Sequence, residues 1–197
     1  QRGANGFHGG DGPLSVSDIG TKNELIEAFI GGAGEIGVPR NDDFNGAQQQ
    51  GYGLYRLNQR DGVRVSNSRA FLHPVLARPN LRVLTGVRVT RVLIEQGRAV
   101  GVAYLQDGQE KTLRAEREVI LSAGAFQSPQ LLMLSGIGPA DHLRQHGIGV
   151  ALDLPGVGAN LHDHPDVVQV WDVPGARELF GLSLAGAWRT LGDIGRW

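Results

Sequence analysis

The sequence predicts a mixed α/β fold in which an antiparallel β-meander precedes a strand of a parallel sheet. Two observations support this prediction. Short runs with strand character are separated by turn residues between positions 81 and 114, and an unbroken apolar run follows at residues 119–121. A strand without polar alternation is typical of a parallel sheet, where both faces are buried. An antiparallel ribbon placed before such a strand is typical of an insertion in a doubly wound fold.

The N-terminal part is predicted to combine loops with one amphipathic helix. A Gly-rich stretch around His8 is typical of a loop, and a short strand is expected at residues 14–16. Asp18 is a suitable N-cap for the helix that follows. Apolar residues then recur at helical spacing, namely Leu25, Ile26, Phe29 and Ile30.

Two further segments precede the meander. Residues 41–53 are polar around Phe44 and Tyr52, which is typical of a loop that lines or covers a cavity. Residues 66–77 are predicted to be helical, and Pro74 is expected to disturb this helix.

The meander is the clearest part of the architecture. Gly97 and the pair Asp107-Gly108 provide turns between its three main strands. We predict an antiparallel three-stranded sheet preceded by one short strand, with the four strands at residues 81–84, 87–94, 99–105 and 110–114.

The apolar run at residues 119–121 is followed by four small residues, Ser122, Ala123, Gly124 and Ala125. Their lack of bulk lets a ligand approach the main chain at the carboxyl end of the predicted strand, where open α/β sheets bind cofactors. A helix is predicted to begin at Ser128 and Pro129 and to end at Gly136.

The C-terminal part continues with a second helix, predicted from Pro139 to His146. A strand is expected over residues 166–173. A last amphipathic helix is indicated by Leu184, Trp188, Leu191 and Ile194.

A family resemblance rests on the stretch after the apolar run. Residues 124–138 resemble, at every defined position, the second signature of the glucose-methanol-choline (GMC) oxidoreductases, flavoproteins that oxidise alcohols with FAD. The matching residues are Gly124, Ala125, Ser128, Pro129, Leu131, Leu132, Ser135, Gly136, Ile137 and Gly138. Further similar stretches occur in the same order at residues 8–14, 44–46, 62–64, 78–81 and 154–164. Residues 173–184 are similar to the bacterial choline and alcohol dehydrogenase branch.

The resemblance implies a glutathione-reductase-like FAD-binding domain combined with a GMC substrate-binding domain, each present in part. Residues 1–77 would belong to the substrate domain and its cavity-lining loops, residues 78–165 to the FAD domain, and residues 166–197 to a further substrate-domain segment. Phe44 and residues 48–52 are expected to line the substrate pocket.

Three residues are implied to bind FAD. Val89 would present its backbone to the adenine, and Ala123 and Gly124 would pass close to the adenosine or the pyrophosphate. Val89 also suits a core strand, and both roles are compatible because the contact uses the main chain.

No catalytic residue is assigned within the chain. A Gly-x-Gly-x-x-Gly turn after a strand is absent, and none of the six histidines matches the active-site histidine of the family. We therefore expect a middle portion of a larger enzyme that is inactive alone and that needs the remaining segments of its polypeptide.

Composition excludes several other functions. The chain has 197 residues, 41% of them hydrophobic, with a net charge of −1, so it is globular and lacks the basic surface of a nucleic-acid-binding protein. The absence of cysteine excludes disulfides and thiol catalysis. His142 and His146 share a helical face but lack a third ligand, so no metal site is predicted and solvent exposure is expected.

The predicted partners are therefore a small alcohol and an electron acceptor of unknown type. No apolar run has the length of a membrane span, so we expect a cytoplasmic location, with peripheral membrane association left open. Two alternatives to the alcohol oxidoreductase remain: an FAD-containing hydroxynitrile lyase on the same scaffold, and a binding module without catalysis.

Overall fold

The computed structural model describes residues 3–20, 24–171, 188 and 191, and the chain divides into two compact units. The first unit comprises Gln1–Arg82 and Gln169–Trp197, and the second comprises Val83–Val168. All three predicted cofactor residues lie in the second unit.

The first unit consists mainly of loops around short elements. Among its described residues the named elements are the helix α1 (Glu24–Glu35), the strands β1 (Gln59–Arg60) and β2 (Val63–Arg64), the π-helical turn η1 (Ser68–Leu72) and the 3-10 turn η2 (His73–Val75). Two isolated bridges, Ser17 with Leu57 and Arg40 with Tyr52, connect the loops.

The sequence predictions for this unit are largely confirmed. The predicted amphipathic helix is α1, and residues 41–53 form a loop. Asp18 is not the N-cap of this helix, because Ile19 and Gly20 are not helical. Asn41 is buried and closes this loop, because its Nδ2 donates hydrogen bonds to the carbonyl oxygens of Gln48 and Gln50. The helical segment at residues 66–77 is broken into η1 and η2, with Pro74 near the start of η2.

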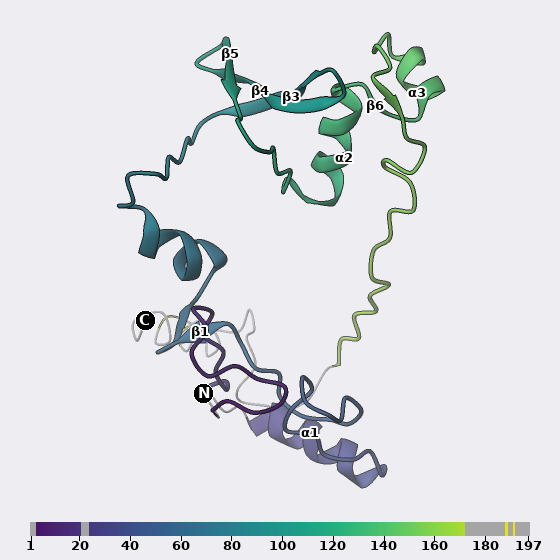
Figure 1. Ribbon diagram of the computed structural model, residues 1–197. Coiled ribbons are helices and arrows are strands. Elements are labelled where there is room, and N and C mark those ends of the chain that lie inside the picture. Colours follow the sequence, from purple (N-terminus) through teal and green to yellow (C-terminus); the bar gives the residue numbers. More distant parts are fainter. Residues whose placement is uncertain (1–2, 21–23, 172–187, 189–190, 192–197) are drawn as a thin grey trace. The chain divides into compact units, whose positions relative to one another are not determined.

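The second unit contains the predicted meander. The strands β3 (Arg88–Glu95), β4 (Arg98–Gln106) and β5 (Gln109–Arg114) form an antiparallel sheet in the order β3-β4-β5 (Figure 1). Positive φ angles at Gln96 and Gly97, and at Asp107 and Gly108, give both tight turns the twist that two-residue hairpins need.

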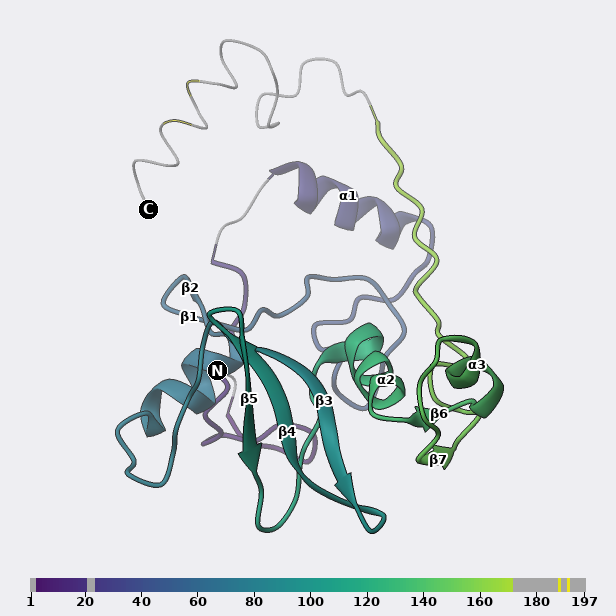
Figure 2. The same ribbon diagram turned by 90° about the horizontal axis from the view of Figure 1, so that it is seen from above.

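A helical layer accompanies the sheet in this unit. The helix α2 (Gly124–Leu134) packs beside β3, as two perpendicular views agree (Figures 1 and 2). The short strand β6 (Ile137–Gly138) pairs in parallel with β7 (Leu152–Asp153), and α3 (Ala140–Gln145) lies between them in sequence. The buried apolar side chains of the unit are Val92, Ala103, Leu131, Ala140 and Leu143.

The C-terminal ends of α2 and α3, and the start of α3, were predicted correctly. Gly136 ends α2 with φ +82°, and a Cβ at this position would lie 2.5 Å from the carbonyl oxygen of Gly149, so only glycine fits. Pro139 is the N-cap of α3, and Gly147 follows the end of α3 with φ +68°.

The prediction of a buried parallel strand at residues 119–121 is wrong. No strand forms there, and Ile120 is 75% exposed. A strand requires a hydrogen-bonding neighbour, and no described residue pairs with this run. Apolar composition alone therefore predicted its burial but could not supply a partner.

Three shorter strand predictions are also wrong for the described residues. Residues 81–84 and 166–171 form no strand, and residues 14–16 are followed only by the single bridge at Ser17. Trp188 and Leu191 are helical as predicted, whereas residues 172–173, Leu184 and Ile194 lie outside the described residues.

The predicted start of α2 is wrong by several residues. The helix begins at Gly124, and Pro129 therefore lies inside it, where the missing N–H removes one intrahelical hydrogen bond. The Ser128-Pro129 pattern is typical of a helix start, but the Ser128 hydroxyl instead accepts a hydrogen bond from the N–H of Ala123 at 3.0 Å.

Candidate cofactor site

The turn that begins α2 has a main chain that is open to a ligand. Gly124 takes φ +88°, and a Cβ at this position would meet nothing within 4 Å. Ala123 and Gly124 are both exposed. The first N–H groups of a helix have no partner inside the helix and favour negatively charged groups, so the turn suits a phosphate-bearing ligand.

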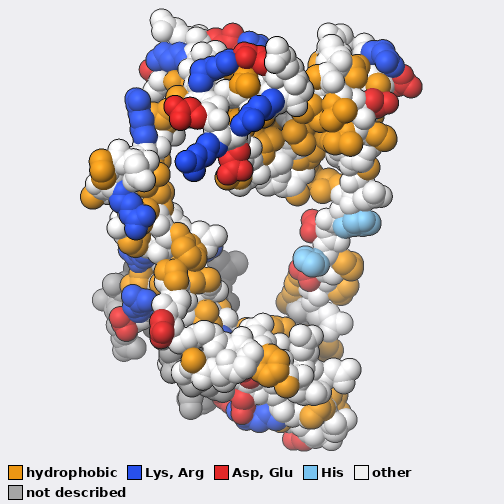
Figure 3. All heavy atoms as spheres, viewed as in Figure 1, with side chains coloured by type: hydrophobic (Ala, Val, Ile, Leu, Met, Phe, Trp, Pro, Cys, Tyr) orange, Lys and Arg blue, Asp and Glu red, His pale blue; other side chains and the backbone are white. Residues whose placement is uncertain are grey.

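The Ser128 side chain fixes the position of Ala123, the residue that precedes Gly124. Its hydroxyl accepts the N–H of Ala123, which fixes the direction of the main chain as it enters the helix. Hydrophobic side chains gather over α2 and β6 in the space-filling view (Figure 3). Phe126 and Leu134 of α2 are exposed.

Val89 lies on β3 opposite Tyr104 of β4. The register shifts directly after it, between Val89 and Arg91, and such a bulge redirects the main chain of a strand. The Val89 side chain is 39% exposed, so within the described chain it is not a core valine. The contact of Val89 with adenine stays a prediction.

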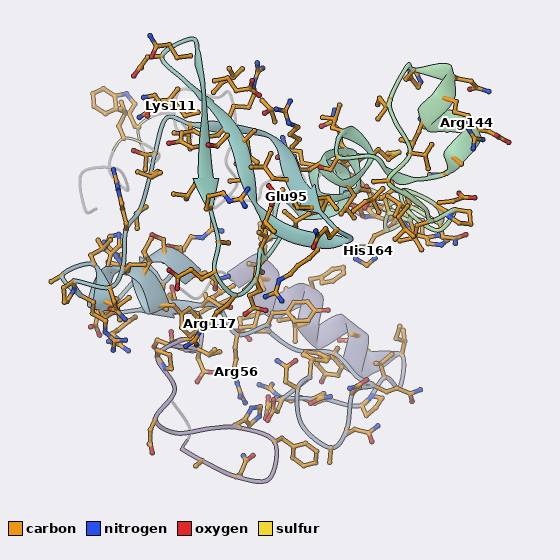
Figure 4. All side chains as sticks on the ribbon, turned by 45° about the horizontal axis from the view of Figure 1, so that its top comes forward. Arg56, Glu95, Lys111, Arg117, Arg144 and His164 are labelled. Carbon is orange, nitrogen blue, oxygen red and sulfur yellow. The ribbon has the colours of Figure 1, made fainter. Side chains whose placement is uncertain are left out.

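The elements that carry the three predicted residues are in contact. Val89 lies on β3, Ala123 and Gly124 lie at the start of α2, and α2 packs against β3. At the far end of the sheet, Glu95 of β3 and Arg114 of β5 form two parallel hydrogen bonds, one of 2.9 Å (Figure 4). The Arg114 guanidinium lowers the pKa of the Glu95 carboxyl.

A separate polar cluster in the first unit was missed by sequence reasoning, which treated His8 as a loop residue. His8 Nε2 and Asp43 Oδ2 are 2.6 Å apart, and Arg56 Nη2 lies 3.4 Å from the same carboxylate oxygen. The hydrogen bond with His8, followed by the backbone N–H of Asn45 and the charge of Arg56, lowers the pKa of Asp43. A signal existed, because His8 is the first residue of one stretch that carries the family resemblance and Asp43 directly precedes another.

This cluster borders a cavity of about 340 Å³. Arg56 is labelled in Figure 4. Its side chain is only 13% exposed, and its Nε is 3.6 Å from Asp18, beyond hydrogen-bond distance. His8, Asn45 and Arg56 provide polar groups on the cavity wall, and Phe7 and Leu14 provide apolar ones. The predicted pocket residue Phe44 does not line this cavity but stacks against Tyr55, with ring centroids 5.1 Å apart.

The predicted exposure of His142 and His146 is confirmed, and their rings contact edge to face with centroids 4.7 Å apart. His162 and His164 are exposed, and His164 (Figure 4) donates its backbone N–H to the side chain of Asp163.

Over the described ranges, no three acidic or histidine side chains form a group that could hold a metal. None of the described helices has the length and apolar character of a membrane span.

Comparison with known proteins identifies the enzyme class. A family profile described as GMC oxidoreductase matches residues 5–166. The chain is 53% identical over 165 residues to mitochondrial choline dehydrogenase of Mus musculus, covering 84% of the chain and 28% of that protein. It is 48% identical over 163 residues to alcohol dehydrogenase (acceptor) of Pseudomonas putida, covering 82% of the chain and 30% of that protein.

Solved structures agree with this comparison. Pyridoxine 4-oxidase from Mesorbium loti superposes with a TM-score of 0.71 at 37% identity, covering 75% of the chain and 29% of that structure. A formate oxidase superposes with a TM-score of 0.67 at 32% identity, covering 74% and 26%.

The chain thus spans less than a third of the length of the relatives that it matches. The match confirms the family predicted from residues 124–138, the mixed α/β fold class and FAD as the cofactor of this enzyme class. By its sequence match over residues 5–166 and its fold, the chain belongs to the GMC oxidoreductases.

Proposed function

We propose that the intact protein is an FAD-dependent oxidoreductase that oxidises the CH–OH group of a small primary alcohol, either choline-like or aliphatic. The observation that supports it most strongly is the similarity to choline and alcohol dehydrogenases across more than four fifths of the chain. FAD, when bound, accepts a hydride from the carbinol carbon, and the hydroxyl proton passes to a base, so that the alcohol becomes an aldehyde.

The role of the second unit in this proposal is to hold the cofactor. The open main chain at Ala123 and Gly124 would contact the adenosine or pyrophosphate, and the backbone of Val89 would contact the adenine. The open space around Gly124, where a Cβ would meet nothing within 4 Å, fits a ligand close to the main chain. Residues 78–165 would accordingly belong to the FAD domain, and the flanking residues 1–77 and 166–197 to the substrate domain.

The catalytic base is proposed to lie in another segment of the polypeptide. Hydride transfer requires the substrate within contact distance of the flavin and a base within hydrogen-bond reach. The chain would provide cofactor contacts and one part of the pocket wall, through Phe44 and residues 48–52.

The substrate class is supported by relatives rather than by pocket geometry. Structural relatives include a pyridoxine 4-oxidase and a formate oxidase, so this scaffold accommodates different substrates. Choline and small alcohols are favoured because the two curated relatives reported above are named choline dehydrogenase and alcohol dehydrogenase (acceptor).

The test is anaerobic reduction of the full-length protein. The purified protein should show a flavin spectrum, and mixing with choline or a primary alcohol should bleach it and yield the aldehyde. A tertiary alcohol is the matched control, because its carbinol carbon has no hydrogen to transfer. A protein that takes up no FAD would refute the proposal, and retained FAD with cyanide release from a cyanohydrin but no bleaching would favour a hydroxynitrile lyase.

A further inference from the structure

We infer that Ser135 is a positioning residue for the adenosine side of the FAD site, an inference that rests on the proposed function. Ser135 follows the last residue of α2 and connects this helix to β3. Its Oγ accepts the backbone N–H of Val92 at 2.8 Å and donates to the carbonyl oxygen of Leu131 at 2.6 Å.

The strand side of this connection is a buried edge. β3 is an outer strand of the meander, so one edge of it has no strand partner in the described chain. Val92 is buried, and its N–H points to the edge where Ser135 lies. Without the hydroxyl, this donor would be left without a partner in a buried setting, which proteins strongly avoid.

Val92 lies between two irregularities of β3. The register with β4 shifts between Val89 and Arg91 and again between Leu93 and Ile94. The segment between the two shifts is therefore fixed on one edge by its pairing with β4 and on the other edge by the hydrogen bond to Ser135. Val89 lies just beyond the first shift, so its main-chain position depends on how this segment is fixed.

The helix side of the connection extends to the cofactor turn. α2 runs from Gly124 to Leu134, a length of about 16 Å, so the Gly124 turn and Ser135 lie at opposite ends of one helix. The buried Leu131 adds an apolar contact near the same end. Ser135 thus fixes α2 against β3, and with it the separation between the Gly124 turn and the Val89 backbone.

This geometry gives Ser135 a role beyond stability. The two groups predicted to contact the adenosine half of FAD lie on two different elements, and Ser135 makes the hydrogen bond between those elements. Loss of the hydroxyl should therefore weaken the binding of ligands that contain the adenosine diphosphate group. It should leave the affinity for ligands without that group unchanged.

The experiment uses full-length apoprotein and three ligands, namely FAD, ADP and FMN. We expect Ser135→Ala to raise the Kd of FAD and of ADP about tenfold, the effect of losing roughly one hydrogen bond, with no change for FMN. Ser135→Thr keeps the hydroxyl and should restore the affinity for ADP.

The matched control is Asp153→Ala. Asp153 in β7 accepts the backbone N–H of Ala140 at the start of α3 at 3.0 Å, so it also connects a strand to a helix through a side chain and a buried residue. This variant should lower the melting temperature without changing the Kd of ADP.

Four results separate the possibilities. Unchanged ADP affinity in Ser135→Ala, beside a wild-type protein that binds FAD and oxidises alcohols, would overturn the inference alone. Equal weakening of ADP and FMN would reduce Ser135 to a general structural role and also overturn it. If Ser135→Ala does not fold, Ser135→Thr decides, because weak ADP binding in a variant with native melting would contradict the inference. A wild-type protein that binds no FAD would overturn both the inference and the proposed function.

Discussion

Gly124 is the residue at which cofactor binding can be tested with least disturbance of the fold. Its φ of +88° and the φ of +76° at Gly108 are similar, and a Cβ at either position meets nothing within 4 Å. Gly124→Ala and Gly108→Ala should therefore carry a similar backbone strain, about 1–2 kcal/mol.

We predict that only Gly124→Ala weakens FAD binding, by about tenfold or more, because a methyl group would occupy space next to the cofactor. The measurement is FAD titration of full-length apoprotein, with thermal melting to confirm equal strain. Equal FAD affinity in the two variants would contradict the assignment of Gly124 to the cofactor site.

At the same scale, Asp43 connects two loops of the first unit through His8 and Arg56. Because its pKa is lowered in the folded protein, the ionised carboxylate stabilises the fold. This contribution is complete above the ordinary pKa of an aspartate, about 4, and is lost as the pH falls through the lowered value.

Asp43→Asn should accordingly lower the melting temperature at pH 7, and the difference from wild type should shrink as the pH falls below about 4. Asp42→Asn is the control, since the Asp42 ion pair with Arg40 is exposed and such pairs contribute little. Melting curves of the full-length protein across this range are the measurement. A difference that persists at low pH would indicate a role of Asp43 other than its charge.

At the scale of elements, close packing between β4 and β5 depends on Gly101. A Cβ at this position would clash with the carbonyl oxygen of Leu113, a main-chain atom that cannot move without disturbing the sheet. In α1, by contrast, a Cβ at Gly31 meets nothing within 4 Å.

The same substitution should therefore have opposite effects in the two elements. We predict that Gly101→Ala destabilises the protein by about 1–3 kcal/mol, as overpacking does, and that Gly31→Ala stabilises it by up to about 1 kcal/mol through helix propensity. Denaturant unfolding monitored by circular dichroism measures both. Wild-type stability in Gly101→Ala would show that β5 is not held as closely against β4 as the structure indicates.

At the scale of the whole molecule, the chain carries the three residues proposed to contact FAD but no assigned base. Large apolar side chains of the second unit, such as Ile120 and Phe126, are 75% exposed. Exposed apolar surface of this kind is typical of a face that packs on other protein. We propose that further segments of the polypeptide cover it.

We predict that residues 1–197 alone, supplied with FAD and an artificial electron acceptor, show no alcohol oxidation above background. The full-length protein under the same conditions is the control. Turnover by residues 1–197 at a rate comparable to the full-length enzyme would place the catalytic base within this chain.

The sequence alone determined the elements whose structure depends on local interactions. The hairpins of the meander follow from Gly97 and from Asp107-Gly108, since turn conformation is a property of a few adjacent residues. The ends of α2 and α3 follow from Gly136 and Gly147 for the same reason. The family could also be predicted, because its signature is a contiguous motif.

Tertiary structure decided what depends on partners distant in sequence. Residues 119–121 have the composition of a buried strand but remain unpaired, because a strand exists only with a neighbour. The contacts of His8 with Asp43, and of Ser135 with Val92, join residues 35 and 43 positions apart in the sequence. Sequence periodicity describes each segment separately and cannot predict such contacts, which form only when the segments pack together.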